Sequence, residues 1–177
     1  IAPEKVVRDL SDLVGLPQYL RAQGIEAGTT VLGTRVIMAG DELAGEMQIG
    51  PEAWIFVIER LRLANGLPFS LETVRFPAEL FPGLLDQSLV GSLYELLESD
   101  YQIQRGEAIE TITAVAAERA QAAALQVAIG TPLLAVRRTA TLTDGRIFEY
   151  SHEVYRADHI AITVHAPGSD AARRHLT

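Results

Sequence analysis

The sequence contains no cysteine, which excludes disulfides, thiolate metal sites and a cysteine nucleophile. Long apolar runs are also missing, since none approaches the roughly 20 residues that a membrane-spanning helix needs. The first residues, IAPEKVVRDLSDL, lack the basic and apolar regions of a signal peptide. We therefore expect a cytoplasmic protein that has no membrane partner.

Positive charge is scarce: 15 Lys and Arg residues stand against 23 Asp and Glu residues, and the net charge is −8. A domain that grips nucleic acid by its phosphates normally carries a basic patch. Here basic residues are adjacent only at 137–138 and 173–174. This chain by itself is therefore not expected to contact DNA.

What the sequence does contain is enough apolar residues, 48% of 177, for one well-filled core. The length fits a single domain, predicted over residues 1–166, with a flexible tail over residues 167–177. Helices are predicted at 11–24, 41–50, 91–100 and 118–130. Strands are predicted at 29–40, 53–64, 68–76, 106–117, 132–143, 146–157 and 160–166. Helices interleaved with hairpins indicate an α+β domain with helices packed on an antiparallel sheet.

Glycines set the predicted ends of these elements. The helices at 41–50 and 118–130 are expected to end at Gly50 and Gly130. Asn65-Gly66 and Asp144-Gly145 each separate two apolar runs, which is the strongest short-range signal of a hairpin.

A weak internal repeat connects the two hairpins. Residues 54–77 and 133–157 share one order: an apolar run, an arginine pair, Asn-Gly or Asp-Gly, an aromatic residue and a glutamate. The spacing differs by a residue or more. The repeat indicates two similar hairpins in one antiparallel sheet.

Arg60 and Arg62 form an unusual charge pair for a strand that fills a core. They project from one face, because residues i and i+2 of a strand share a face. The turn decides whether Glu72 joins them. A two-residue turn at Asn65-Gly66 would set Glu72 opposite Glu59, on the other face.

A three-residue loop at 64–66 would instead set Glu72 opposite Ile58, on the arginine face. We favour this loop, because directly opposed like charges are destabilising. The same choice in the second hairpin sets Glu149 opposite Thr139.

Two interpretations of these charges remain open. They could form a solvated sheet face whose surface ion pairs contribute roughly 0–1 kcal/mol each. They could also line a partly covered pocket, where two guanidiniums bind a carboxylate or phosphate and the glutamates accept hydroxyl or amide protons from the same ligand.

The segment GSLYELL can also be interpreted in two ways. Ser92 and Glu95 have the spacing of a capping box. A helix N-terminus with a hydroxyl is also a ready anion site. If Ser92 and Tyr94 face the two arginines, the two interpretations merge into one cradle for an anion.

Signals for catalysis are weak. The sequence has no Gly-x-Ser-x-Gly, no phosphate-binding loop and no dinucleotide fingerprint. His152, His159 and His165 match no metal-ligand spacing. We expect a protein that is not an enzyme, with neither cofactor nor metal.

Three segments together resemble a known family: RLRLANGLPFSLETVRFPAELFPGL, SLYELL and GTPLLAVRRTATLTDGRIFEYSHEVYRADHI. They are similar to the UTRA effector-sensing domain of GntR-type bacterial transcription regulators, HutC subfamily, over residues 5–165. The resemblance implies a chorismate-lyase-like fold, an antiparallel sheet of about six strands flanked by helices. It also implies a homodimer and a small-molecule effector.

In that family an N-terminal winged-helix domain binds operator DNA, and no such domain is expected in this chain. IAPEKV resembles the end of the wing and the linker that follows it. The resemblance thus implies that DNA is contacted through a domain absent from this chain.

The resemblance also implies the site. In members that sense phosphosugars, the effector is bound by residues that match Arg60, Arg62, Glu72, Ser92, Tyr94, Glu149 and Tyr155 here. One position departs from the pattern: those members often have Phe followed by Ser or Thr where this chain has Leu16-Pro17, and proline has no N–H to donate. The expected effector is an anionic metabolite, such as a phosphosugar or a small carboxylic acid.

Two other functions fit the same fold. The alternative is a chorismate-lyase-like enzyme that acts on a small aromatic or sugar acid. The third is a dimerisation module that binds no ligand.

Overall fold

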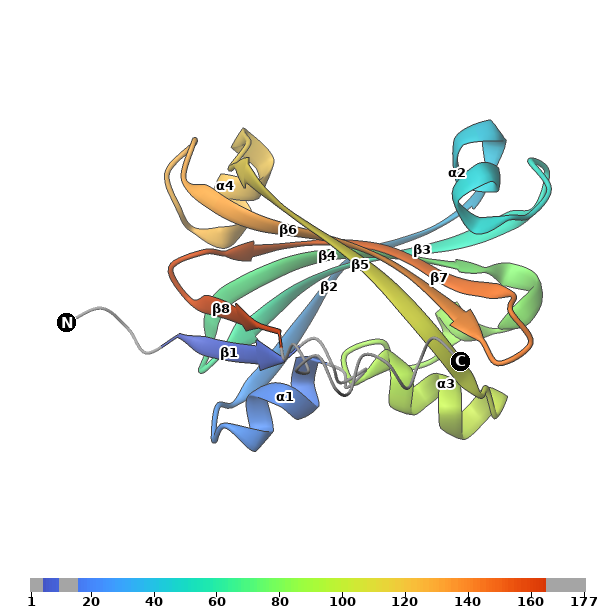
Figure 1. Cartoon of the computed structure of the whole chain (residues 1–177), viewed down its shortest axis with the longest axis horizontal. Helices are drawn as coiled ribbons and strands as arrows, with labels where there is room; N and C mark the ends of the chain where they lie inside the picture. The colour runs from blue at the N-terminus through green and yellow to red at the C-terminus, as the bar shows by residue number, and fades with distance from the viewer. Residues whose placement is uncertain (1–4, 10–15, 165–177) are drawn as a thin grey trace, which may run out of the picture.

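The computed structural model describes residues 5–9 and 16–164, and its main element is a six-stranded antiparallel sheet (Figure 1). The strand order is β2-β3-β4-β7-β6-β5. The strands are β2 (Ala27–Met38), β3 (Trp54–Ala64), β4 (Leu67–Pro77), β5 (Arg105–Ala116), β6 (Pro132–Leu142) and β7 (Ile147–Arg156). The predicted α+β class and the predicted number of strands are confirmed.

A second, two-stranded sheet pairs β1 (Val6–Asp9) in parallel with β8 (Ile160–Thr163). The strand predicted at 160–166 is therefore real but shorter, and it lies outside the main sheet. No strand was predicted at the position of β1. Because Val6 and Ile160 are both buried, this small sheet is anchored to the rest of the domain.

Helices cover both faces of the main sheet (Figure 1). On one face lie α1 (Leu16–Ala22) and α3 (Leu93–Tyr101). On the other face lie α2 (Gly40–Met47) and α4 (Arg119–Leu125), one at each end of the strands. Two short 3₁₀ helices, η1 (Ala78–Leu80) and η2 (Leu84–Asp86), connect β4 to α3.

Helices α2 and α4 end earlier than predicted. Their C-caps are Gln48 and Gln126, both left-handed, so the predicted stops at Gly50 and Gly130 are wrong. A left-handed residue at this position lets its N–H bond back to the last turn of the helix. The predicted tail at 167–177 and the start of the predicted helix at 11–24 lie outside the described residues.

The core is divided between the two faces of the sheet. Phe76, Phe81 and Phe148 pack edge to face on the α3 side. On the opposite side, Met47 of α2 and Leu125 of α4 each seal one end of the sheet. The middle of the α1–α3 side is thus flanked by packed layers, and this is where the pocket lies.

The first hairpin differs from the predicted one. Asn65 and Gly66 both have positive φ, 49° and 76°, and Ala64 pairs with Leu67. This is a two-residue turn, so the predicted three-residue loop is wrong.

A bulge in β4 changes the register after this turn. Phe69 has no partner on β3, and beyond it Arg62 pairs with Ser70 and Arg60 with Glu72. Glu72 therefore lies on the arginine face, as predicted, but opposite Arg60 and not opposite Ile58.

The second hairpin has the predicted three-residue loop at 143–145, in which Gly145 has a φ of 87°. A bulge again follows, at Phe148, and it sets Glu149 opposite Ala140. The predicted partner, Thr139, is therefore wrong by one residue.

The fold confirms two similar hairpins and extends the repeat. The order α1-β2-α2-β3-β4 is followed by the same order, α3-β5-α4-β6-β7, and the strands of the two halves mirror each other about the β4–β7 pair. The bulges at Phe69 and Phe148 occupy equivalent positions. The two halves are thus related by an approximate two-fold axis between β4 and β7.

Candidate functional site

A small cavity of about 50 Å³ lies between the main sheet and the layer formed by α1 and α3. Its walls include every residue that the sequence predicted for the site: Arg60, Arg62, Glu72, Ser92, Tyr94, Glu149 and Tyr155. The strands supply most of these side chains from alternate positions on one face. The structure thus brings together residues that lie almost 100 positions apart in the chain.

Arg60 and Arg62 share one carboxylate, and we call these three residues the Arg60–Arg62 cluster. Arg60 donates from Nε to Glu72 at 2.6 Å, and its Nη2 lies 2.5 Å from the same oxygen. Burial alone would raise the pKa of Glu72, but the charges of the two arginines hold it below its usual value. Glu72 therefore stays ionised between them.

Arg60 also stabilises the segment that precedes α3. Its side chain is only 1% exposed, and Nη1 donates to the carbonyl oxygens of Leu89 and Gly91. Those bonds fix the segment that leads into α3. Burial lowers the pKa of Arg60, and the charge of Glu72 partly offsets this.

Arg62 has unused hydrogen-bonding capacity. Its Nη1 donates to Thr29 Oγ1 at 2.9 Å, and its Nη2 lies 3.4 Å from Glu72. Its Nε is buried and has no hydrogen-bond partner among the described residues. Because buried donors in native proteins are nearly always satisfied, Arg62 Nε is the atom in this site that most needs an acceptor.

The first turn of α3 closes this side of the cavity. Ser92 is the N-cap, and its Oγ accepts a hydrogen bond from the N–H of Glu95 at 3.3 Å. The predicted capping box is half formed, because the Glu95 carboxylate accepts from Gln18. Ser92, Leu93 and Tyr94 all line the cavity, so the positive end of the helix dipole lies beside the arginines.

A second arginine pair, missed from the sequence, forms another part of the wall. Arg8 of β1 and Arg138 of β6 each lie 2.7 Å from the same oxygen of Glu110 on β5. Arg8 also donates to the Tyr155 hydroxyl at 3.2 Å, and Arg138 to the Tyr94 hydroxyl at 2.6 Å. We call Arg8, Arg138 and Glu110 the Arg8–Arg138 cluster.

Arg8 and Arg138 keep their positive charges. Burial opposes ionisation of Arg138, but Tyr94 and the nearby glutamates raise its pKa above the usual value. The sequence partly indicated Arg138, because it belongs to the arginine pair at the repeated position of the second hairpin. Arg8 was not indicated, since no sequence pattern brings β1 to the main sheet.

Buried carboxyl groups paired with hydroxyls lie between the two clusters. Glu149 accepts from the hydroxyls of Tyr94 and Ser151. Glu153, also missed from the sequence, accepts at 2.5 Å from Tyr155 and at 2.5 Å from Ser70. Burial raises the pKa of both glutamates.

One expectation from the sequence relates directly to this cavity. Pro17 lines it, so the position where the chain departs from the family pattern is at the site.

In the part of the chain that the structure describes, no group of His, Asp or Glu residues is arranged to hold a metal ion. Over the same residues, no helix is long and apolar enough to cross a membrane.

The fold is that of the effector domains of transcription regulators. PhnF from Mycobacterium smegmatis aligns with a TM-score of 0.90 at 25% identity, covering 96% of this chain and 75% of that chain. The separate effector domain of PhnF aligns with a TM-score of 0.87 at 25% identity, over 92% of this chain and 100% of that domain.

The chain belongs to the UTRA domain family, whose model matches residues 22–161. This is the type of effector domain found in GntR-family transcription regulators. The chain is similar to the HTH-type transcriptional repressor NagR of Bacillus subtilis, with 28% identity over 158 residues, or 89% of this chain and 65% of NagR. It is also similar to the Escherichia coli repressor MngR, with 26% identity over 93% of this chain and 68% of MngR.

Proposed function

We propose that this domain senses an anionic metabolite, which binds at the Arg60–Arg62 cluster beside the first turn of α3. The observation that carries this proposal is the buried Arg62, whose Nε lacks an acceptor among the described residues. A phosphate or carboxylate oxygen would satisfy it, and the helix terminus favours the same charge. A sensor is preferred to a chorismate-lyase-like enzyme because NagR, MngR and PhnF are all named as regulators.

The proposed effector is a phosphosugar or a small carboxylic acid. The hydroxyls and carboxyls of Tyr94, Glu149, Glu153 and Tyr155 suit the alternating donors and acceptors of a sugar. MngR is named as the repressor of a mannosyl-D-glycerate transport and metabolism system, which also supports a sugar derivative. Pro17 provides no N–H, so the anion would rely on arginines and α3.

Replacing Arg62 by glutamine tests the pocket. Inorganic phosphate is expected to raise the melting temperature of the unaltered chain, and Arg62→Gln is expected to weaken phosphate binding roughly 10- to 100-fold, because a charge-assisted hydrogen bond contributes about 1.5–3 kcal/mol. Calorimetric titration measures the affinity. Arg146→Gln, which removes an exposed arginine paired with Asp144, is the matched control. A full phosphate response in Arg62→Gln would show that the anion binds elsewhere.

The whole protein is proposed to be a DNA-binding regulator of the HutC subfamily. NagR and MngR each contain sequence outside the matched part, since the chain spans 65% and 68% of them. We propose an N-terminal winged-helix domain that binds operator DNA in the cytoplasm. Effector binding would shift the population of domain arrangements and so change operator affinity.

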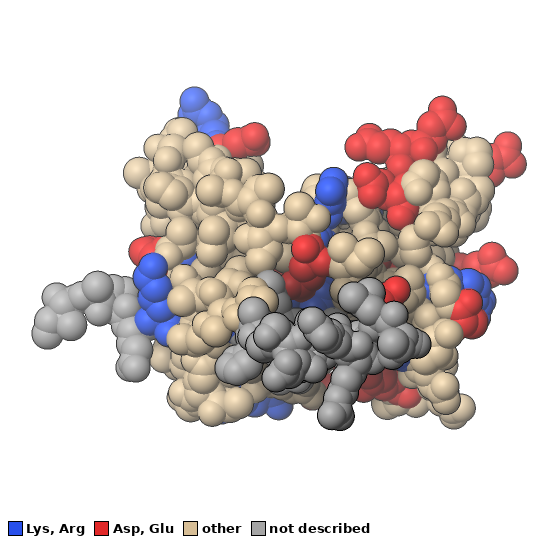
Figure 2. Space-filling model, in the orientation of Figure 1, with Lys and Arg blue, Asp and Glu red and all other residues tan. Residues whose placement is uncertain are grey.

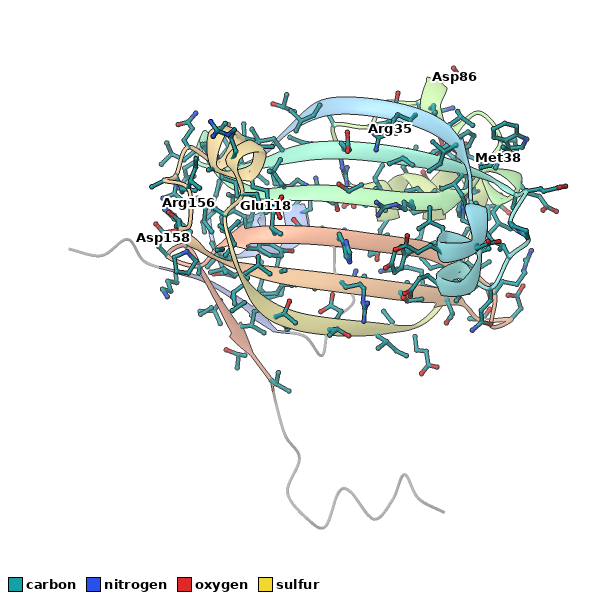
Figure 3. All side chains as sticks on the ribbon, turned by 90° about the horizontal axis from the view of Figure 1, so that it is seen from above. Arg35, Met38, Asp86, Glu118, Arg156 and Asp158 are labelled. Carbon is teal, nitrogen blue, oxygen red and sulfur yellow. The ribbon has the colours of Figure 1, made fainter. Side chains whose placement is uncertain are left out.

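We propose that two copies of this domain dimerise through the face of the sheet opposite the pocket. Figure 2 shows that this face is hollowed between α4 and α2, and a cavity of about 700 Å³ lies beside α4 in this hollow. Figure 3 looks onto it, with Arg35 labelled on β2. Its floor carries Arg35, Arg75 and Arg137, whereas α2 carries the exposed acids Asp41, Glu42 and Glu46. A two-fold axis would place each acidic helix over the partner's basic floor.

Substitutions on α4 test this interface. Ala120 is exposed and lines the hollow, so Ala120→Arg is expected to convert the dimer to a monomer in light scattering. Ala123 is exposed on the same helix but is not part of the wall, and Ala123→Arg is expected to leave the dimer intact. If both variants stay dimeric, the dimer uses another surface.

A further inference from the structure

The two halves of the fold place an arginine at equivalent positions in the cavity. Next to each bulge, Arg62 pairs with Ser70 in the first half and Ala140 pairs with Glu149 in the second. Two residues further along, the equivalent positions are Arg60 and Arg138, and both side chains line the same cavity. The approximate two-fold axis thus relates one arginine site to a second.

The two clusters contain the same number of positive and negative groups. In the Arg60–Arg62 cluster, two guanidiniums share the single carboxylate of Glu72. In the Arg8–Arg138 cluster, two guanidiniums share the single carboxylate of Glu110. Two positive charges around one negative charge leave an excess of one positive charge within each cluster, and burial raises the pKa of Glu149 and Glu153 between the clusters, which favours their uncharged forms. Because Arg8 and Arg138 are both 8% exposed, that excess is shielded from solvent and favours a bound anion.

We propose that the Arg8–Arg138 cluster is a second anion subsite, so that the effector is a hydroxylated compound with two acidic groups, of the phosphorylated sugar acid type. One acid binds the Arg60–Arg62 cluster and α3, and the other binds Arg8 and Arg138. This inference rests on the proposed function and specifies its ligand class.

The distance between the two clusters matches the length of such a compound, and the cavity of about 50 Å³ would have to widen to admit it. Arg60 on β3 and Arg138 on β6 lie on opposite sides of the central β4–β7 pair, three interstrand spacings apart, or about 14 Å between their backbones. Both long side chains extend towards the cavity that lies between them. The hydroxyls and carboxyls of Tyr94, Glu149 and Glu153 line the intervening wall, where they can bind the hydroxyl groups of the ligand.

The second subsite also connects the ligand to β1. Arg8 is the residue by which β1 contacts the main sheet's pocket, through Glu110 and Tyr155. An acid group that binds Arg8 would therefore hold β1 against the sheet. A ligand with one acid, bound at the Arg60–Arg62 cluster alone, would leave β1 without this additional bond.

Matched ligand pairs test the proposal on the purified chain. Glucitol 6-phosphate and 6-phosphogluconate are open chains that share a phosphate and differ in the second acid group; glycerol 3-phosphate and 3-phosphoglycerate form a shorter pair. At least one diacid is expected to bind tenfold or more tightly than its partner by calorimetric titration. Arg138→Gln and Arg8→Gln are expected to reduce that ratio to below threefold, and Arg146→Gln, at an exposed arginine paired with Asp144, is expected to preserve it.

Two variants keep the test decisive if one of them fails to fold. Far-ultraviolet circular dichroism and melting temperature identify a folded variant, and Arg8 lies on β1, which pairs with β8 outside the main sheet. Equal binding within both pairs, or a ratio that survives in a folded Arg8→Gln or Arg138→Gln variant, would overturn the second subsite. Failure of the proposed function looks different, because inorganic phosphate would then show no binding that depends on Arg62.

Discussion

Replacing Glu72 by glutamine is expected to lower the free energy of unfolding by about 3–5 kcal/mol, because removing one partner of a buried ion pair leaves its charge uncompensated. Arg60 and Arg62 are only 1% and 4% exposed, and Glu72 is the carboxylate that both of them contact. Without it, two guanidiniums repel each other in a site that water hardly reaches. Urea denaturation of the variant and the unaltered chain measures the loss.

The same variant is expected to respond more strongly to phosphate. A bound anion would take the place of the missing carboxylate, and phosphate at 100 times its dissociation constant adds about 2.7 kcal/mol to the stability. Glu59→Gln is the control, since Glu59 forms a half-exposed pair with Arg35 on the other face of β3 and contributes roughly 0–1 kcal/mol.

Two results would contradict this interpretation of Glu72. One is a loss of stability no larger than that of Glu59→Gln, which would mean that the buried charges are compensated in another way. The other is an equal phosphate response in both variants, which would place the anion away from Arg60 and Arg62.

Local patterns in the sequence predicted most of the main sheet. Alternating polarity and the two turns, Asn65-Gly66 and Asp144-Gly145, define the hairpins. The predicted partners were wrong by two residues for Glu72 and by one residue for Glu149, in part because the bulges at Phe69 and Phe148 leave no signal in the sequence. A bulge results from how the strand packs on its neighbours, and neighbours are known only once the fold is formed.

The pocket was predictable in part, for a related reason. Arg60, Arg62 and Glu72 lie within one hairpin, so the period of a strand indicates their common face. Glu110 and Arg138 reach the same cavity from the far half of the sheet, and Arg8 reaches it from β1. These charges come together only because β6 pairs with β5 and β1 pairs with β8. Neither pairing can be predicted from local patterns, because the paired strands are separated in the sequence.

The approximate symmetry shows what the residues that were not predicted from the sequence contribute to the cavity. It gives the cavity two arginine sites, but the rest of the wall is unequal: Val74 and Phe76 in one half correspond to Glu153 and Tyr155 in the other. A symmetric frame with an asymmetric lining can orient a ligand whose two ends differ. This favours a compound with two different acids over one with two identical acids.

Anion binding is expected to strengthen as the pH falls, by up to tenfold per pH unit for each proton taken up. Burial raises the pKa of Glu149 and of Glu153 above the usual value of 4.5, and the negative charge of Glu72 raises the pKa of Glu153 further. A bound anion adds another negative charge beside them, so it favours their protonated forms. Binding and proton uptake are therefore coupled.

Without a ligand, the stability contributed by Glu149 and Glu153 should also increase as the pH falls. A carboxyl group whose pKa is raised by folding contributes its full stability below pH 4.5. This contribution is lost as the pH rises through the pKa of the group in the folded state. Glu72 behaves in the opposite way, because its lowered pKa gives stability above 4.5 that is lost as the pH falls. The strengthening of anion binding is thus expected above 4.5, where Glu72 remains ionised and Glu149 and Glu153 take up protons.

Sulfate is the suitable probe, because its own charge does not change over this range of pH. Its affinity, measured by calorimetric titration in buffers of different ionisation enthalpy, is expected to rise with falling pH and to show proton uptake. Glu149→Gln and Glu153→Gln are each expected to reduce the slope, since glutamine keeps the hydrogen-bonding shape but takes up no proton. Glu59→Gln should keep the full slope. If the slope is the same in all three variants, the protons are taken up outside the pocket and the buried carboxyls do not control the affinity.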